Sequence, residues 1–197
     1  MMRRRRFTAL FAALLLAIST GTAALAQGSS WTIDQNHAEV NFEIRHMGVS
    51  TVRGAFSGIT GTVVWDEKNL ANSSVTATID ATTVSTNNEA RDKHLKSPDF
   101  FNVEKFPTLT FKSTSVQRVN GKLQLVGDLT QTGITKSVTL DVDGPTPPQK
   151  GMQGGRVIGF SATGIIHRSD FNVGSKFAPP MLGDDVKFTI DVEADQK

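Results

Sequence analysis

Four histidines are the side chains of this sequence with the clearest capacity for chemistry, because imidazole binds metal ions and exchanges protons near neutral pH. Three of them held together could bind zinc and activate a water molecule for hydrolysis. No two are three or four residues apart, the spacing that places a pair on one helix face. The four are His37, His46, His94 and His167. A metal-assisted hydrolase is therefore the alternative hypothesis and not the first one.

Other nucleophiles are not indicated. The sequence has no Gly-x-Ser-x-Gly motif, which would expose an activated serine on a sharp turn. It also has no cysteine, which excludes thiol catalysis, cysteine zinc sites and disulfide bonds. We therefore predict no catalytic residue, no cofactor and no enzymatic activity.

One short helix is predicted in a chain that otherwise has the patterns of β-strands. Thr86 and Glu89 have the spacing of a capping box, and Pro98 follows about three turns later. The predicted helix covers about residues 87–97.

Arg91, His94 and Leu95 have spacings of three and four residues, which places them on one face of that helix. Such a face, followed by Phe100, could cover the mouth of a binding site. Arg91 could bind a phosphate or another polar head group, since guanidinium is a planar set of donors. It could instead form a structural ion pair, which is the interpretation we favour. The candidate partners are Asp92, Asp99 and Glu104.

The rest of the chain alternates apolar and polar side chains, as half-buried β-strands do. In residues 38–46, Val40, Phe42 and Ile44 lie on one face, and His46 continues the series. The same alternation recurs in seven further segments, at residues 52–65, 75–79, 109–111, 123–129, 134–142, 157–167 and 186–192. Short turn signals separate many of these segments and favour antiparallel pairing.

About eight antiparallel strands with one apolar face can form a two-sheet sandwich or a closed barrel. Glycines inside the long segments 51–65 and 155–168 favour the barrel, because glycine permits the bends that a closing sheet needs. No strand has a run of lysines or prolines that would protect an open edge. We predict an all-β fold with an antiparallel eight-stranded barrel, whose interior could be solid or could hold one small ligand.

Residues 1–26 have the pattern of a signal peptide. Arginines at 3–6 precede an apolar run at 7–18, and Ala24-Leu25-Ala26 fits the small-x-small rule for cleavage. The run is shorter than the roughly 20 apolar residues of a spanning helix, and no later segment approaches that length. We predict export to the periplasm, one mature domain at residues 27–197, and no transmembrane segment in it.

The charge of the chain changes when this signal is left out. Four of the 21 Lys and Arg residues and none of the 19 acidic residues lie in residues 1–26, so the remainder has a net charge of −2. Without excess positive charge, the electrostatic attraction that drives nucleic-acid binding is missing. Nucleic acid is therefore excluded as a partner.

Several motifs occur in order between residues 31 and 194. The longest is Asn88-Glu-x-Arg91-Asp92-x-His94-Leu95-x-Ser97-Pro98-Asp99-Phe100-Phe101. Others are Trp31-Thr-Ile-Asp34, Gly48-Val-Ser-Thr-Val52-Arg-Gly54, Phe106-Pro107-Thr-Leu-Thr-Phe111 and Gly183-Asp-Asp-Val186. Together they resemble the YceI family of periplasmic lipid-binding proteins. The resemblance implies a lipocalin-like barrel with a helix at one side and a long apolar interior for polyisoprenoids or other long-chain amphiphiles.

The predicted function is non-catalytic binding, with transport or storage, of a polyisoprenoid, a quinone tail or a fatty-acid derivative. The inward apolar rows and the helix face supply the predicted ligand-binding residues. These are Val40, Phe42, Ile44, His46, Phe56, Arg91, His94, Leu95, Phe100, Phe111, Leu125, Leu129, Phe160 and Phe188. The same apolar rows could instead fill a solid core. A homodimer is compatible with the sequence but not required by it.

Overall fold

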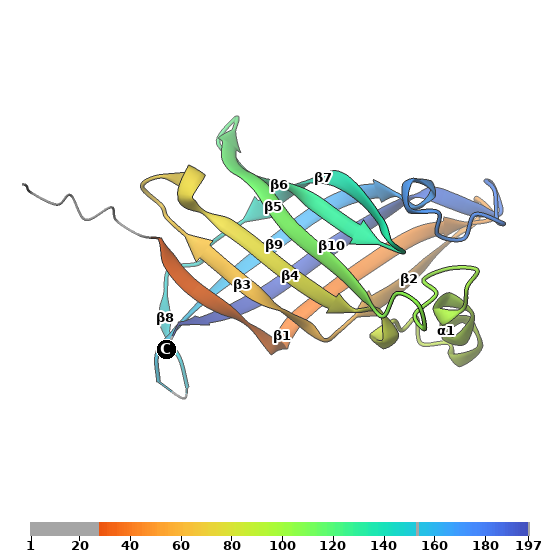
Figure 1. Cartoon of the computed structure of the whole chain (residues 1–197), viewed down its shortest axis with the longest axis horizontal. Helices are drawn as coiled ribbons and strands as arrows, with labels where there is room; N and C mark the ends of the chain where they lie inside the picture. The colour runs from red at the N-terminus through yellow and green to blue at the C-terminus, as the bar shows by residue number, and fades with distance from the viewer. Residues whose placement is uncertain (1–27, 153, 197) are drawn as a thin grey trace, which may run out of the picture.

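Ten β-strands form the sheet that dominates the computed structural model, which describes residues 28–152 and 154–196 (Figure 1). The predicted signal peptide at residues 1–26 lies outside the described residues. The strands are β1 (Ser29–His46), β2 (Ser50–Phe56), β3 (Ile59–Trp65), β4 (Ser74–Asp80), β5 (Thr108–Val119), β6 (Lys122–Gln131), β7 (Ile134–Asp143), β8 (Gln149–Lys150), β9 (Arg156–His167) and β10 (Leu182–Gln196).

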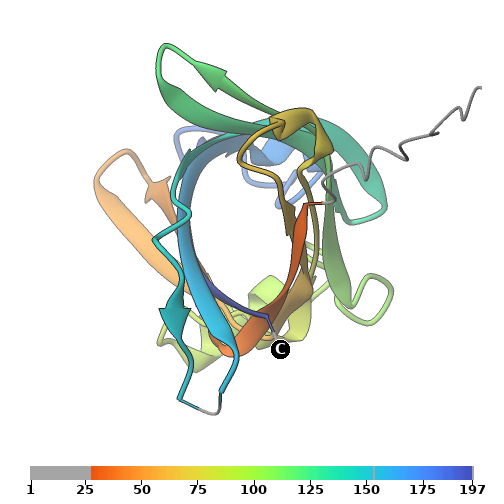
Figure 2. The same ribbon diagram turned by 90° about the vertical axis from the view of Figure 1, so that its left-hand side faces the viewer.

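The sheet closes on itself. Its strand order is β10-β1-β3-β4-β5-β6-β7-β9, and β9 pairs again with β10, so eight strands form a barrel. Every strand pair in the described residues is antiparallel. Viewed from one end, the strands form a ring (Figure 2). The predicted eight-stranded antiparallel barrel is therefore confirmed.

The seam between β7 and β9 is the shortest contact in this ring. It consists of three residue pairs, which join residues 141–143 to residues 161–163. By comparison, β9 and β10 stay paired from His167 and Asp185 to Arg156 and Gln196. Beyond the seam, the Thr132 hydroxyl donates a hydrogen bond to the Phe171 carbonyl, which attaches the β6–β7 turn to the segment after β9.

The predicted single strand at residues 52–65 is two strands, β2 and β3. The break falls at Ser57-Gly58, where Gly58 has a φ of 71°, in the left-handed region that glycine adopts without strain. As a result, the first part of β1 pairs with β3 and the second part pairs with β2. The two sections of β1 are separated by a register shift between Ile33 and Ala38.

Two of the predicted turn signals are tight hairpin loops. Asn120-Gly121 joins β5 to β6 and Thr132-Gly133 joins β6 to β7. All four residues have positive φ angles, between 51° and 80°. That geometry matches the right-handed twist of the flanking strands, so both hairpins close in two residues.

The predicted short helix is present as α1 (Glu89–Lys96), at one end of the barrel (Figure 1). Its cap differs from the prediction: the side chain of Asn88 accepts the hydrogen bond from the Arg91 backbone N–H. The carboxylate of Asp92 instead binds the backbone N–H of Thr86, at 2.7 Å, and the Thr86 hydroxyl. The Thr86–Glu89 capping box is thus wrong, because Thr86 is already held by Asp92.

Three short 3₁₀ segments complete the described structure: η1 (Leu70–Asn72), η2 (Ala81–Thr83) and η3 (Arg168–Phe171). None of the helices in the described residues has the length and apolar character needed to cross a membrane.

Candidate ligand-binding site

An apolar cavity runs through the interior of the barrel. Its volume is about 460 Å³, which lies within the range of small-molecule sites in proteins. All eight barrel strands contribute to its wall, together with β2 and α1. It extends from Trp65 and Ser74 at one end to Arg91, His94 and Met181 at the end near α1.

The inward-facing rows do not meet in the middle of the barrel. Phe42, Phe111 and Phe188 line the cavity, and each is only partly buried. Trp31, which does not line the cavity, is by contrast buried almost completely. The interior is therefore a lined cavity and not a solid core.

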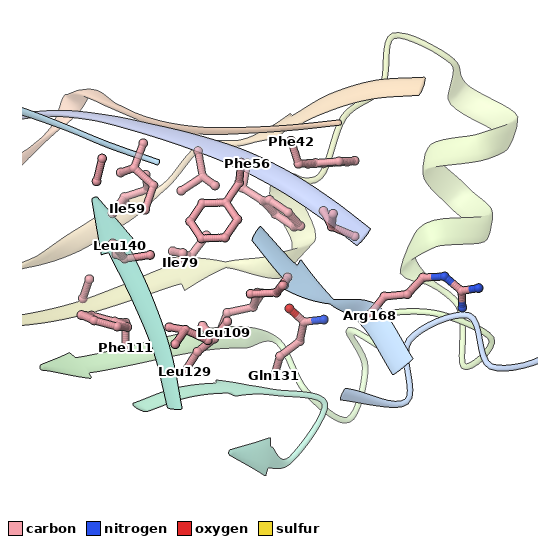
Figure 3. Close-up of a pocket in the computed structure, with 18 of the residues that line it drawn as sticks. Phe42, Phe56, Ile59, Ile79, Leu109, Phe111, Leu129, Gln131, Leu140 and Arg168 are labelled. Atoms are coloured by element: carbon pink, nitrogen blue, oxygen red, sulfur yellow. The ribbon is translucent and has the colours of Figure 1, made fainter. Parts of the chain in front are cut away.

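Three phenylalanine rings of the wall lie over glycines of neighbouring strands. A Cβ added at Gly164 would lie 2.5 Å from Cζ of Phe188, and one added at Gly54 would lie 2.5 Å from Cζ of Phe42. Carbon atoms make contact at about 3.5–4.0 Å, so any side chain at these positions would displace the ring. The pairs are Phe42 with Gly54, Phe111 with Gly127, and Phe188 with Gly164. The glycines thus allow the rings to stay against the wall, which leaves space at the centre (Figure 3).

The structure places every predicted ligand-binding residue on the cavity wall. These are Val40, Phe42, Ile44, His46, Phe56, Arg91, His94, Leu95, Phe100, Phe111, Leu125, Leu129, Phe160 and Phe188. Their position is observed, whereas their contact with a ligand remains a prediction.

Arg91 is held by hydrogen bonds and not by an ion pair. Its Nε donates to the Thr86 hydroxyl at 2.7 Å and its Nη2 donates to the Thr86 carbonyl at 2.9 Å. Among the described residues, no carboxylate lies within ion-pair distance of Arg91. The favoured ion pair with Asp92, Asp99 or Glu104 is therefore wrong, and two of these carboxylates have other partners: Thr86 binds Asp92 and Lys176 binds Asp99. Burial raises the pKa of Asp92, but the hydrogen bonds from Thr86 and Ser85 and the nearby charge of Arg91 together lower that pKa.

An aromatic cluster covers the cavity at the α1 end. The ring of His94 makes edge contacts with Phe100, at 5.0 Å between centroids, and with Phe177, at 5.7 Å. Phe100 and Phe177 are stacked, at 5.3 Å. Asp99 also joins the segment of His94 and Phe100 to the segment of Phe177. Its carboxylate accepts a hydrogen bond from Lys176 Nζ at 2.5 Å and lies 3.3 Å from His94 Nε2. These bonds, first that from Lys176, lower the pKa of Asp99.

Arg168 fixes the segment that follows η3, and the sequence analysis did not single it out. It is 5% exposed, and burial lowers the pKa of its guanidinium. All five of its N–H groups donate to backbone carbonyls, which leaves none for a ligand. The acceptors are Gly183 for Nε, Val173 and Gly174 for Nη1, and Phe177 and Leu182 for Nη2.

Gln131 is a polar residue of the wall that the sequence analysis also missed. It is the last member of the inward row of β6, after Leu123, Leu125, Gly127 and Leu129. The row has a period of two, so continuing it by one step beyond Leu129 would have placed Gln131 inside the barrel.

The histidines do not form a metal cluster. His37 lies 2.6 Å from Asp34 on the outer face, and His167 lies 2.9 Å from Asp185 elsewhere on the surface. In the part of the chain that the structure describes, the group able to hold a metal ion is Asp34, His37 and Glu193, which contains a single histidine and is largely exposed. The converging histidines that the hydrolase hypothesis needs are absent from the described residues, which include all four.

A closed antiparallel barrel around a lined apolar cavity, with a short helix over one end, defines the class of this protein. The chain belongs to the YceI-like family, because the family's domain model matches residues 31–194. It is 40% identical over 193 residues to the protein YceI of Escherichia coli O157:H7, an alignment that covers 95% of both chains.

Solved structures show the same fold. The YCEI protein of Campylobacter jejuni superimposes with a TM-score of 0.68 and 34% identity, over 78% of this chain and 90% of that one. A polyisoprenoid binding domain from Saccharophagus degradans superimposes with a TM-score of 0.65, over 85% of this chain and 98% of that one. Its identity is 12%, so this second likeness concerns the fold alone.

Proposed function

We propose that this protein binds a long-chain amphiphile in the barrel cavity and carries or stores it without chemical change. The ligand class is a polyisoprenoid, a quinone tail or a fatty-acid derivative. The observation that supports the proposal is the continuous apolar cavity, whose wall is formed by aliphatic and phenylalanine side chains from every barrel strand.

Burial of the tail supplies the affinity. Each methylene that the ligand transfers from water to the cavity contributes about 0.8 kcal/mol. A hydrocarbon tail offers no charge to recognise, so its selection depends on length and cross-section, which the positions of the wall rings determine.

The proposed site of action is the periplasm, and the proposed leader is residues 1–26. The charged start, short apolar run and Ala24-Leu25-Ala26 sequence support export. The polyisoprenoid binding domain from S. degradans shares this fold, which agrees with the proposed ligand class.

Native mass spectrometry of the exported protein, followed by organic extraction, tests the proposal. We expect one long-chain lipid for each barrel, released as an intact molecule. A stoichiometric metal ion without any lipid would contradict the carrier function.

A matched pair of variants connects this result to the cavity. Phe111→Asp places an unpaired carboxylate on the wall, which costs several kcal/mol against an apolar ligand, whereas the neighbouring Thr110→Asp faces outward. We expect lipid to be lost from the first variant and retained by the second, with folding of both checked by circular dichroism. Equal lipid content in two folded variants would show that Phe111 does not face the ligand.

A further inference from the structure

The amide of Gln131 is a buried polar group that no described residue satisfies. The residue is 5% exposed and lines the cavity. No hydrogen bond joins its side chain to another group within residues 28–152 and 154–196, although its backbone carbonyl accepts one from the Thr132 hydroxyl. The other buried polar side chains of the wall differ in this respect, since Thr86, Ser73 and Arg168 all have partners.

The free amide faces the cavity. Among the described residues, no fully enclosed side-chain nitrogen or oxygen lacks a partner, so both amide atoms of Gln131 must reach open space. The open space beside them is the cavity, and Figure 3 shows the side chain directed inward between Leu129 and Arg168. A buried amide without a partner is unfavourable, so this position favours a ligand that restores its hydrogen bonds.

The surroundings of Gln131 select the chemistry of that ligand. A carboxamide offers two donors and one acceptor and carries no charge. Arg168 is the cation labelled beside Gln131 in Figure 3, and backbone carbonyls accept hydrogen bonds from all five of its N–H groups. A phosphate or carboxylate beside Gln131 would therefore find no free N–H donor on Arg168 to replace its lost hydration, whereas a neutral group matches the uncharged carboxamide.

We propose that Gln131 is the subsite for the polar end of the bound molecule, and that this end is a neutral hydrogen-bonding group such as a carbonyl or a hydroxyl. The inference rests on the proposed function and adds an orientation to it. Gln131 ends β6 at the α1 end of the barrel, so the polar end lies there and the tail extends toward Trp65.

Three ligands that share one isoprenoid skeleton test this subsite: geranylgeraniol, geranylgeranyl phosphate and the hydrocarbon phytane. Their binding is measured by displacement of the uncharged dye N-phenyl-1-naphthylamine from delipidated protein. For the unchanged protein, we expect geranylgeraniol to bind more tightly than geranylgeranyl phosphate. Gln131→Leu should weaken geranylgeraniol about tenfold and leave phytane unchanged, because only the alcohol loses a hydrogen bond.

Gln124→Leu is the matched control. Gln124 lies on the same strand but on the outer face, where its amide donates to Asp141, so the affinities should stay unchanged. The thermal midpoint of ligand-free Gln131→Leu should not fall, because an unsatisfied amide is replaced by an apolar group of similar shape. A structural role for Gln131 would lower that midpoint.

The outcomes separate the two proposals. Tight binding of all three ligands with no effect of Gln131→Leu would overturn the subsite and leave the carrier function intact. Preference for geranylgeranyl phosphate over geranylgeraniol would also overturn it. Failure of every ligand to displace the dye would contradict the carrier function and the subsite together.

Discussion

Gly164→Ala tests whether the cavity depends on phenylalanine rings that lie against the wall. A Cβ at this position would lie 2.5 Å from Cζ of Phe188 and 3.1 Å from Cδ2 of Leu140. Because carbon contacts need about 3.5–4.0 Å, the ring tip must move by roughly 1–1.5 Å. The backbone of the wall lies on one side of the ring, so the movement must be toward the cavity.

The expected effect is larger on binding than on stability. Filling a packed core with an extra carbon costs about 1–3 kcal/mol, but in the ligand-free protein the ring of Phe188 enters empty space. We therefore expect a destabilisation below about 1 kcal/mol, which is a thermal shift of less than about 4 °C for a domain of this size. A ligand that must share the cavity with the displaced ring loses about 1–3 kcal/mol, or about 5- to 150-fold in affinity.

The assay is titration of delipidated protein with geranylgeraniol in the dye-displacement format, beside a thermal unfolding curve. Phe188→Leu combined with Gly164→Ala is the control, since the shorter side chain removes the collision and should restore most of the affinity. Unchanged affinity in folded Gly164→Ala would refute the idea that Phe188 limits the cavity. A weak double variant would indicate that Gly164 acts through the backbone.

Three further predictions concern the segments around the α1 end. Arg168→Lys should lower the free energy of unfolding in urea by about 2–4 kcal/mol, because an ammonium cannot reach five separate carbonyls. The exposed Arg118→Lys is the control and should leave the free energy of unfolding unchanged. The pKa of Asp92 is lowered, so its stabilisation is complete above its unfolded value of 3.8 and is lost as pH falls through the lower folded value. Asp92→Asn should remove the share of the acid dependence of stability that this carboxylate contributes, and a wild-type acid profile in that variant would contradict it. Asn88→Ala should cost about 1 kcal/mol and speed amide exchange in α1, whereas unaltered exchange would show that the cap is dispensable.

The strands could be predicted from the sequence because the residue patterns that indicate them lie within short segments of the chain. Val40, Phe42 and Ile44 alternate with charged neighbours, and Asn120-Gly121 has the residue types that a tight hairpin demands. These features predicted the strands, the turns and the inward faces, and the glycines of the long segments together with the absence of a protected edge favoured closure into a barrel over a sandwich.

Other features depend on residues that only the fold brings together. The carbonyls around Arg168 have no common sequence pattern, and the pairing of Phe188 with Gly164 needs the register of two strands. Thr86 has two partners of suitable chemistry, and the sequence alone favours Glu89 over Asp92. Whether the inward rows enclose a cavity depends in turn on the curvature of the whole ring, which no single segment determines.

If the barrel binds the proposed ligand, the three-pair contact between β7 and β9 bears on how quickly that ligand would exchange. Local opening requires least free energy where few ladder bonds must break, so this is the place where we expect the wall to part. A long tail could then enter broadside through the gap instead of threading end-on past α1. The residence time of the ligand would then depend on how often β7 and β9 separate. We expect backbone amides near residues 141–143 to exchange with deuterium sooner than those between β9 and β10.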